Sequence, residues 1–357
     1  MFDNEKIKLR LERAVNERVF PGCVFGAADK SGNSIVIPVG HFTYKDGAKS
    51  VDADTVFDIA SITKSLAGTS SLLKLVDEGK LSLDDKVVDF IPEFGNFENK
   101  KQVTIKHILT YSLEFELPPM SSLKDLAPEE LYKKGIEAPL RAEPGLQYFY
   151  TNATAGLFAP IIKAVTGKRI DQYADESFFA PLGMTKTTFH PEEIDKEGIA
   201  PTEIDDWRGG TIQGEVHDES SYVMSKIGPV AIAGIFSTTP DLLKFVRMLL
   251  AGGDCDGRKY FDEKTIREMY TPQIPNAEPV GLGWAIPSSE VLGNYFSAKT
   301  FYKSGFTGCH MAVDMEKGIG MVLLSNRTYP KRAKDQSSMN ALRRGIADIV
   351  LDTQQSL

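Results

Sequence analysis

Three short segments of this chain carry the residue types that acyl transfer at a serine requires. They are Ser61–Lys64 (Ser-x-x-Lys), Tyr150–Asn152 (Tyr-x-Asn) and Lys303–Gly305 (Lys-Ser-Gly), in that order along the sequence. A serine hydroxyl is a poor nucleophile at neutral pH and needs a base beside it, which a lysine amine or a tyrosine phenolate can supply. An asparagine amide can donate and accept hydrogen bonds at once, and a second lysine can hold an anionic group of a substrate.

Each segment is a weak signal by itself, so its surroundings have to identify the functional copy. Ser-x-x-Lys occurs again at Ser71 and Ser121, and Lys-Ser-Gly occurs again at Lys30. The Ser71 copy lies inside an expected helix, and the Ser121 copy follows two prolines in an expected loop. The Lys30 copy lies between two strand-like runs and predicts a hairpin turn.

Ser61 stands in front of a predicted helix. Apolar or small residues recur at spacings of three and four over residues 62–76, and Gly79 follows where the helix should end. The unpaired N–H groups at a helix start favour a developing anion. Lys64 lies one turn later on the same face, so we expect its amine to reach the Ser61 hydroxyl.

The residue types predict a covalent mechanism. Lys64 can act as a base if it is partly desolvated beside a second cation, for which Lys303 is the candidate. A cationic pocket would also favour the phenolate of Tyr150, and the Asn152 amide suits holding Lys64 and a substrate amide. We expect Ser61 to attack a carbonyl, with Lys64 and Tyr150 sharing the proton, and water to release the acyl-enzyme.

The chain resembles the serine β-lactamase and D,D-peptidase (penicillin-binding protein-like) superfamily, in its class C-like branch, which includes esterases with a β-lactamase fold. The resemblance covers nearly the whole chain and implies a serine hydrolase. It also implies an oxyanion hole made by the backbone N–H groups of Ser61 and Phe306, and substrate binding by Lys303, Ser304 and Gly305. Besides the three motifs it is carried by Phe57–Lys64, Glu78–Asp85, Pro144–Gly145, Val165–Gly167, Gly234–Thr238 and Gly318–Asn326.

The order of the expected elements predicts an α/β fold of the α+β type, β-lactamase/transpeptidase-like. Helices near residues 7–15 and 336–351 flank early and late strands, which implies one antiparallel sheet completed by both chain ends. We expect residues 1–84 and 226–357 to form this sheet subdomain and residues 85–225 an inserted, mostly helical one. The expected strands are residues 22–29, 33–44, 281–286, 300–303, 311–314 and 319–324.

Composition limits the partners that we expect. The chain has 357 residues, 42% hydrophobic and 25% charged, and a formal net charge of −8, which disfavours nucleic acid and anionic membranes. No run of about 18 apolar residues predicts a membrane span. Residues 1–6 lack the pattern of an export leader and the three cysteines are widely spaced, so we expect a cytoplasmic protein, with export of a mature form left open. The oligomeric state is not predicted.

Other chemistries have little support in the sequence. Gly-x-Ser-x-Gly and His-Glu-x-x-His are both absent, and the five histidines never pair at metal-ligand spacing, so we expect neither metal nor cofactor. Glu215, His217 and Asp218 form one tempting cluster, which we interpret as structural or loop-fixing because it holds a single histidine.

The substrate stays open between several classes. A lysine at 303 suits a carboxylate-bearing substrate such as a β-lactam or a D-Ala-D-Ala-type peptide, whereas the lack of a leader favours a small ester or amide. The segment Tyr111–Phe115 replaces a glycine-containing turn common in relatives, which implies a different backbone path near the cleft. The alternatives are a carboxylesterase with this fold and, in another class, a non-catalytic binding or scaffold protein that retains it.

Overall fold

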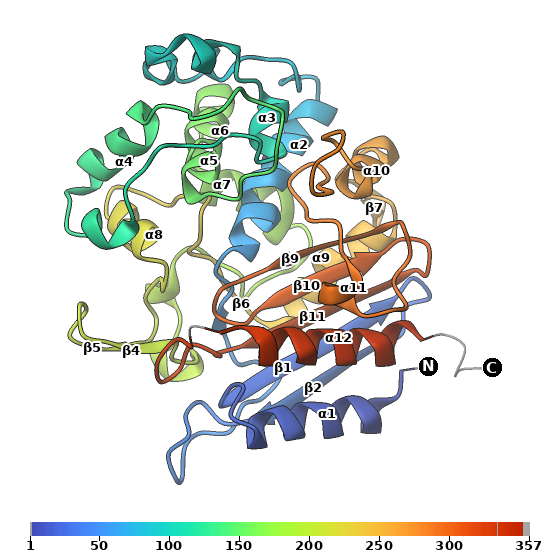
Figure 1. The fold of residues 1–357 in the computed structure, drawn as a ribbon. Helices are drawn as coiled ribbons and strands as arrows, with labels where there is room; N and C mark the ends of the chain where they lie inside the picture. Colours follow the sequence, from blue (N-terminus) through green and yellow to red (C-terminus); the bar gives the residue numbers. More distant parts are fainter. Residues whose placement is uncertain (1, 334, 353–357) are drawn as a thin grey trace.

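A five-stranded antiparallel sheet assembled from both ends of the chain is the centre of the computed structural model, which describes residues 2–333 and 335–352 (Figure 1). The strand order is β2-β1-β11-β10-β9. The strands are β1 (Gly22–Asp29), β2 (Ser34–Gly40), β9 (Thr300–Ser304), β10 (His310–Asp314) and β11 (Ile319–Ser325).

Helices cover both faces of this sheet. Helices α1 (Asn4–Asn16) and α12 (Ser337–Leu351) pack side by side on one face, and α9 (Thr239–Leu250) packs on the other (Figure 1). Since side chains alternate along a strand, Phe25 and Leu323 pack towards α1 and α12 while Val24 and Leu324 belong to the core on the α9 side. Because both faces of β1 and β11 are buried, the sequences of these two strands are continuous apolar runs.

The middle of the chain forms the helical layer that lies above the sheet in Figure 1. Strand β3 (Phe57–Asp58) pairs with β6 (Phe236–Ser237) just before Ser61, and a π-helical turn, Lys64–Thr69, follows and continues into α2 (Ser70–Asp77). The full set of further elements in chain order is β3 (Phe57–Asp58), α2 (Ser70–Asp77), α3 (Ile105–Leu109), α4 (Pro128–Glu137), α5 (Asn152–Gly156), α6 (Phe158–Thr166), α7 (Ile170–Ala174), β4 (Glu203–Asp205), β5 (Gly210–Ile212), α8 (Glu219–Met224), β6 (Phe236–Ser237), β7 (Asp254–Cys255), β8 (Arg258–Lys259), α10 (Glu263–Tyr270) and α11 (Ser289–Leu292).

The predicted α/β fold with an antiparallel sheet is confirmed, and most predicted elements are present. The second strand is shorter than expected and ends at Gly40. The predicted strand over residues 281–286 is wrong, because only isolated bridges form there. Gly283 adopts a φ of +72°, a β-carbon there would lie 2.2 Å from the Thr69 side chain, and this left-handed bend interrupts an extended run. The division into two subdomains at residues 85 and 225 stays a prediction.

Within residues 2–333 and 335–352, no helix combines the length and the apolar character that crossing a lipid bilayer requires.

Candidate active site

Ser61 lies in a tight turn between β3 and the helix that follows. Ala60 has a φ of +47°, an uncommon conformation for a residue with a side chain. The Asp58 carboxylate secures this turn, accepting one hydrogen bond from the Ala60 N–H and one from the His217 N–H, both at 2.7 Å. Because the helix starts at the next residue, the Ser61 hydroxyl stands at its exposed N-terminal end, as the sequence predicted.

Lys64 reaches the Ser61 hydroxyl from the first turn of that helix. Its Nζ lies 3.0 Å from Ser61 Oγ and donates to the Ile232 carbonyl oxygen at 2.8 Å. The side chain is fully buried. The carbonyl fixes the amine in place, so the nucleophile and a candidate base are in hydrogen-bond contact.

Tyr150 extends over both lysines from the residue before the N-cap of α5. The Nζ of Lys303 lies 4.5 Å and the Nζ of Lys64 lies 5.4 Å from the centre of the phenol ring. Burial of the phenol opposes its ionisation, but the charges of Lys303 and Lys64, with hydrogen bonding to Ser61 and Lys64, outweigh this and lower the Tyr150 pKa to about 8. A phenolate is therefore accessible near neutral pH beside the nucleophile.

Lys303 is the second cation of the site, at the cleft end of β9. It is buried between the rings of Tyr150 and Tyr111, with its Nζ 4.8 Å from the centre of the latter. Burial and the nearby charge of Lys64 lower the Lys303 pKa to about 8, against the opposing effect of Tyr150. The geometry thus matches the predicted pairing of two lysines around one phenol.

Asn152, the first residue of α5, has partners other than those predicted. Its Nδ2 donates to Asp218 Oδ2 at 3.0 Å and Ser220 Oγ at 3.1 Å, and no bond to Lys64 is present in the described part of the chain. Asp218 caps α8, accepting from the Ser221 N–H at 2.8 Å. Burial opposes ionisation of this carboxyl, but the Lys64 charge and the serine hydrogen bonds lower its pKa. Asn152 therefore does not bond to Lys64 itself. It bonds to Asp218, whose charge interacts with that of Lys64.

Ser304 is held by a histidine on the neighbouring strand. Its Oγ lies 2.8 Å from His310 Nδ1, and the two residues face each other in the β9–β10 register. Burial and the nearby Arg343 lower the His310 pKa well below its usual value, which keeps the ring neutral. Sequence reasoning missed this contact, although the short β-turn between two strand-like runs signals such cross-strand pairs.

The two predicted oxyanion donors lie on adjoining segments. A β-carbon on Gly305 would lie 2.4 Å from the Ile59 carbonyl oxygen, so the end of β9 touches the turn that carries Ser61. In the described residues neither the Ser61 N–H nor the Phe306 N–H has a backbone or side-chain acceptor. Two free N–H groups beside a nucleophile can receive a developing oxyanion.

His217 connects these two segments from behind. Besides its N–H bond to Asp58, its ring stacks on Phe306, with ring centres 5.7 Å apart, and its Nε2 lies 2.9 Å from Glu203 Oε2. Glu203 also accepts from Arg332 Nε at 2.7 Å. The ring of His217 is buried and lies behind the site, which agrees with the interpretation of this residue as structural.

Tyr111 has a role in the site that the sequence did not predict, although its segment, Tyr111–Phe115, was expected to take an unusual backbone path near the cleft. It has a φ of +51°, and its ring centre is 5.3 Å from that of Tyr150. Its carbonyl oxygen accepts from the Phe149 N–H at 2.7 Å. This segment therefore supplies an aromatic wall that supports Tyr150.

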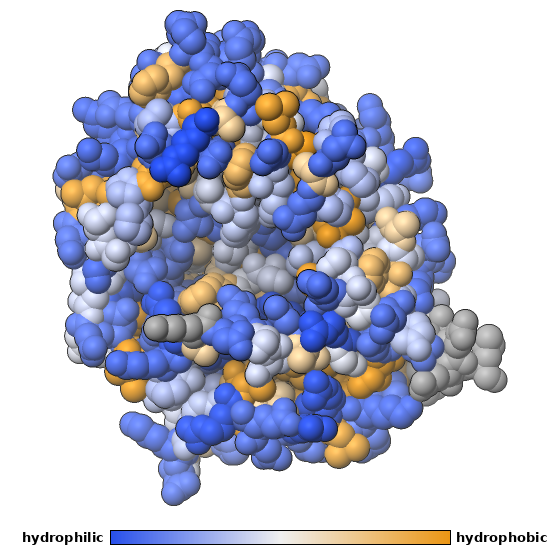
Figure 2. Space-filling model, in the orientation of Figure 1, coloured by the Kyte–Doolittle hydropathy of each residue, from blue (hydrophilic) through white to orange (hydrophobic). Residues whose placement is uncertain are grey.

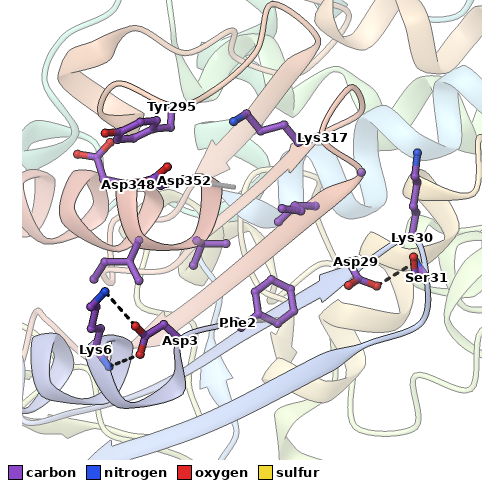
Figure 3. Close-up of a pocket in the computed structure, with 14 residues that line it drawn as sticks. Phe2, Asp3, Lys6, Asp29, Lys30, Ser31, Tyr295, Lys317, Asp348 and Asp352 are labelled. Carbon is purple, nitrogen blue, oxygen red and sulfur yellow. Dashed lines mark hydrogen bonds and ion pairs between the residues drawn. The ribbon is translucent and has the colours of Figure 1, made fainter. Parts of the chain in front are cut away.

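A cavity of about 280 Å³ is lined by Ser61, Tyr150 and residues 303–306. Figure 2 shows a hollow in this face, between the helical layer and the sheet. A separate cavity of about 690 Å³ lies between the start of α1, the β1–β2 turn and the end of α12 (Figure 3). Of the motif residues, only Lys30 and Ser31 of the second Lys-Ser-Gly copy line it, and Lys6 pairs with Asp3 in its wall at 3.1 Å. We therefore assign the candidate active site to the smaller, Ser61 cavity.

Comparison with known proteins identifies the family. The family model described as Beta-lactamase matches residues 10–343. The chain belongs to the β-lactamase family. This β-lactamase-family chain is 30% identical over 321 residues to a protein of Escherichia coli (strain K12) that carries the provisional name D-alanyl-D-alanine carboxypeptidase, with 82% of this chain and 73% of that protein covered.

Solved structures share the fold of this β-lactamase-family protein. EstCE1, described as a hydrolase with promiscuous acyltransferase activity, superposes with a TM-score of 0.78 at 20% identity, covering 97% of this chain and 98% of that one. The octameric penicillin-binding protein homologue from Pyrococcus abyssi gives a TM-score of 0.74 at 26% identity, covering 98% and 79%. Together with the family match, these findings identify a serine hydrolase of the penicillin-binding protein-like type.

Proposed function

We propose that this enzyme hydrolyses an amide or ester bond of a small carboxylate-bearing substrate, of the D-amino-acid peptide type, through an acyl-enzyme on Ser61. The observation that carries the proposal is the contact between Ser61 Oγ and Lys64 Nζ, at 3.0 Å, beneath a phenol whose pKa is lowered to about 8. The name of the Escherichia coli relative, a D-alanyl-D-alanine carboxypeptidase, agrees with this substrate class.

The proposed first half-reaction forms the acyl-enzyme. Ser61 Oγ attacks the carbonyl carbon while its proton passes to the Tyr150 phenolate, either directly or relayed through the Lys64 amine. The oxyanion is held by the N–H groups of Ser61 and Phe306, each donor being worth roughly 10²–10³-fold in rate. The carbonyl–leaving-group bond then breaks, and the leaving group departs with the proton returned by Tyr150.

The second half-reaction restores the enzyme. Tyr150 removes a proton from a water molecule, whose oxygen attacks the acyl carbon, and the released Ser61 oxygen takes up that proton. Lys303 and the Ser304 hydroxyl bind the carboxylate of the substrate on the leaving-group side. Asn152 orients Asp218 and, through it, the charge near Lys64.

An ester is the second candidate substrate class, because a neutral ester needs only the nucleophile, the bases and the oxyanion donors. Rates on nitrocefin, p-nitrophenyl butyrate and a D-Ala-D-Ala peptide, measured side by side, separate the classes. The proposed function predicts the highest kcat/KM on the D-Ala-D-Ala peptide.

Replacement of the nucleophile tests the mechanism. We expect Ser61→Ala to abolish turnover of every substrate that the native enzyme hydrolyses, and a fluorophosphonate probe to label Ser61 in the native enzyme alone, as read by mass spectrometry. Ser121→Ala is the matched control, because Ser121 begins an exposed copy of the same motif and should keep full activity. Undiminished turnover in Ser61→Ala would contradict the proposal.

A further inference from the structure

His310 is a buried side chain directly behind the Ser61 cavity. It faces Ser304 in the β9–β10 register, and its Nδ1 lies 2.8 Å from Ser304 Oγ. Ser304 lines the cavity, whereas His310 is only 2% exposed and takes no part in the lining. His310 therefore contacts a substrate-binding candidate without reaching the substrate itself.

The surroundings of His310 keep its ring neutral. Since side chains alternate along a strand, Ser304 and His310 lie on the face of the sheet that α12 covers. Arg343 of α12 is buried there, and its Nη2 donates to the carbonyl oxygens of Gly308 and Cys309 at 3.3 Å and 3.2 Å. Burial and the Arg343 charge lower the His310 pKa well below its usual value, so the ring carries one hydrogen and not two.

The hydrogen-bond partners decide which ring nitrogen carries that hydrogen. The Nε2 of His310 is buried and has no hydrogen-bond partner among residues 2–333 and 335–352. A hydrogen on Nε2 would be a buried donor without an acceptor, near the positive charge of Arg343, and buried N–H groups without a partner are rarer than bare acceptors. The hydrogen therefore belongs on Nδ1, which faces Ser304 Oγ.

The position of this hydrogen sets the direction in which the Ser304 hydroxyl donates. A hydroxyl has one hydrogen to donate and two lone pairs that accept. When the His310 Nδ1–H donates to Oγ, the hydroxyl hydrogen stays free to point into the cavity. A bare Nδ1 would instead accept that hydrogen, and Ser304 would offer only lone pairs to a substrate. Because anions are bound by donors, only the first arrangement suits a carboxylate.

We propose that His310 is a positioning residue that donates from Nδ1 to Ser304 Oγ and so keeps the Ser304 hydroxyl hydrogen available for the carboxylate of the substrate. The proposal rests on the proposed function, because it concerns selectivity for a carboxylate-bearing substrate over a neutral ester. His310 acts on the binding of the anion and not on the reacting groups. Its loss should therefore change KM and leave kcat nearly constant.

The test measures kcat and KM on a D-Ala-D-Ala peptide and on p-nitrophenyl butyrate, which has no carboxylate. His310→Leu removes the donor, and we expect it to raise KM for the peptide roughly 10-fold, as the loss of a hydrogen bond to a charged group does, and to leave KM for the ester unchanged. His310→Asn places an amide N–H close to the position of Nδ1–H and should restore the native KM.

A double variant shows whether His310 acts through Ser304. Ser304→Ala should raise KM for the peptide by itself, and adding His310→Leu should raise it no further. Thr300→Val is the matched control, because it also removes a buried polar group from β9, one without a hydrogen-bond partner in the described part of the chain and outside the lining of the Ser61 cavity. It should keep the native KM on both substrates.

Nitrogen-15 NMR of the native enzyme, labelled in its histidines, gives a readout that remains if the variants fold poorly. His107, His190 and His217 each keep a hydrogen on Nε2, because a backbone N–H donates to Nδ1 of the first and a carboxylate lies at Nε2 of the other two. His41 is exposed, so its hydrogens exchange with water. We expect one slowly exchanging ring with its hydrogen on Nδ1 and a bare Nε2, which is His310.

The outcomes distinguish this proposal from the proposed function. The role of His310 is overturned if His310→Leu leaves KM for the peptide unchanged, if it changes KM equally on both substrates, if its effect persists in Ser304→Ala, or if no ring of the native enzyme carries its hydrogen on Nδ1 alone. A native enzyme that is labelled at Ser61 and hydrolyses the ester but not the peptide overturns the carboxylate-bearing substrate class, and the role of His310 with it. An unlabelled Ser61 without any turnover overturns the proposed mechanism itself.

Discussion

Two opposing effects set the pKa of Tyr150 and therefore its protonation state in the site. Surrounding protein atoms desolvate the phenol, which favours its neutral form, and it faces two ammonium groups, which favour its anion. The balance lowers the pKa of Tyr150 to about 8, close to the pH at which a general base works best. Lys303 also titrates at about 8, so the two groups titrate as a pair.

Replacing Tyr150 by phenylalanine should remove both the base and the pH dependence. We expect kcat/KM on a neutral ester to rise with pH through about 8 in the native enzyme, because the proposed mechanism uses the deprotonated phenol, whose pKa is lowered to about 8. Tyr150→Phe should lower kcat/KM roughly 10²–10⁴-fold and abolish that rise. The measurement is a pH–rate profile corrected for hydrolysis in buffer alone.

The coupling to Lys303 gives this prediction a control. Lys303→Met removes the positive charge that most strongly favours the phenolate. The increase of kcat/KM with pH should therefore occur at a higher pH, with the shape of the pH–rate profile unchanged. A native profile that is flat across pH 8, or a Tyr150→Phe profile that keeps the rise, would contradict Tyr150 as the base.

At the scale of elements, the site depends on contact between the end of β9 and the turn before α2. Gly305 is the point of contact, because any β-carbon there would lie 2.4 Å from the Ile59 carbonyl oxygen. The sequence showed Gly305 as part of a motif but could not show this distance, since the two segments are far apart in the chain. Its physical role follows only from the packing of the end of β9 against the turn that carries Ser61.

Gly305→Ala should therefore displace Phe306, the proposed oxyanion donor, from Ser61. We expect kcat/KM to fall roughly 10²-fold, as small misplacements of catalytic groups do, with a lower Tm because one segment must shift. Gly210→Ala is the control, since a β-carbon at Gly210 meets no atom within 4 Å. Native kcat/KM in Gly305→Ala would show that the contact does not position the donor.

Local patterns predicted the elements well where one signal was strong. The apolar runs of β1 and β11 and the amphipathic C-terminal helix were found because their periodicity is clear. The prediction of a strand over residues 281–286 was wrong. Gly283 has a left-handed conformation there and packs against Thr69, which belongs to another element. Asn152 was assigned to Lys64, whereas its real partners, Asp218 and Ser220, follow from the position of α8.

At the scale of the whole molecule, Glu203 joins three distant parts of the chain. Its carboxylate lies in β4, contacts His217 Nε2 at 2.9 Å and accepts two bonds from Arg332, from the backbone N–H and from Nε. His217 in turn stacks on Phe306 and bonds to Asp58. The buried network therefore links overall stability to the shape of the proposed oxyanion hole, a relation that no local sequence pattern reveals.

Glu203→Gln should destabilise the protein in a pH-dependent way. Burial opposes ionisation of Glu203, but His217 and Arg332 outweigh it and lower its pKa from 4.5 to about 2. A carboxyl group whose pKa is lower in the folded protein stabilises the fold at every pH above its pKa in the unfolded chain. This stabilisation is lost as the pH falls from 4.5 towards 2. We expect the variant to lose roughly 1–3 kcal/mol of unfolding free energy at pH 7. The difference in unfolding free energy between the variant and the native protein should become smaller at about pH 3, as measured by urea unfolding.

Asp206→Asn, at a side chain that is 93% exposed, is the matched control and should leave the unfolding free energy unchanged at both pH values. A difference that stays constant between the two pH values would mean that the Glu203 charge does not stabilise the network.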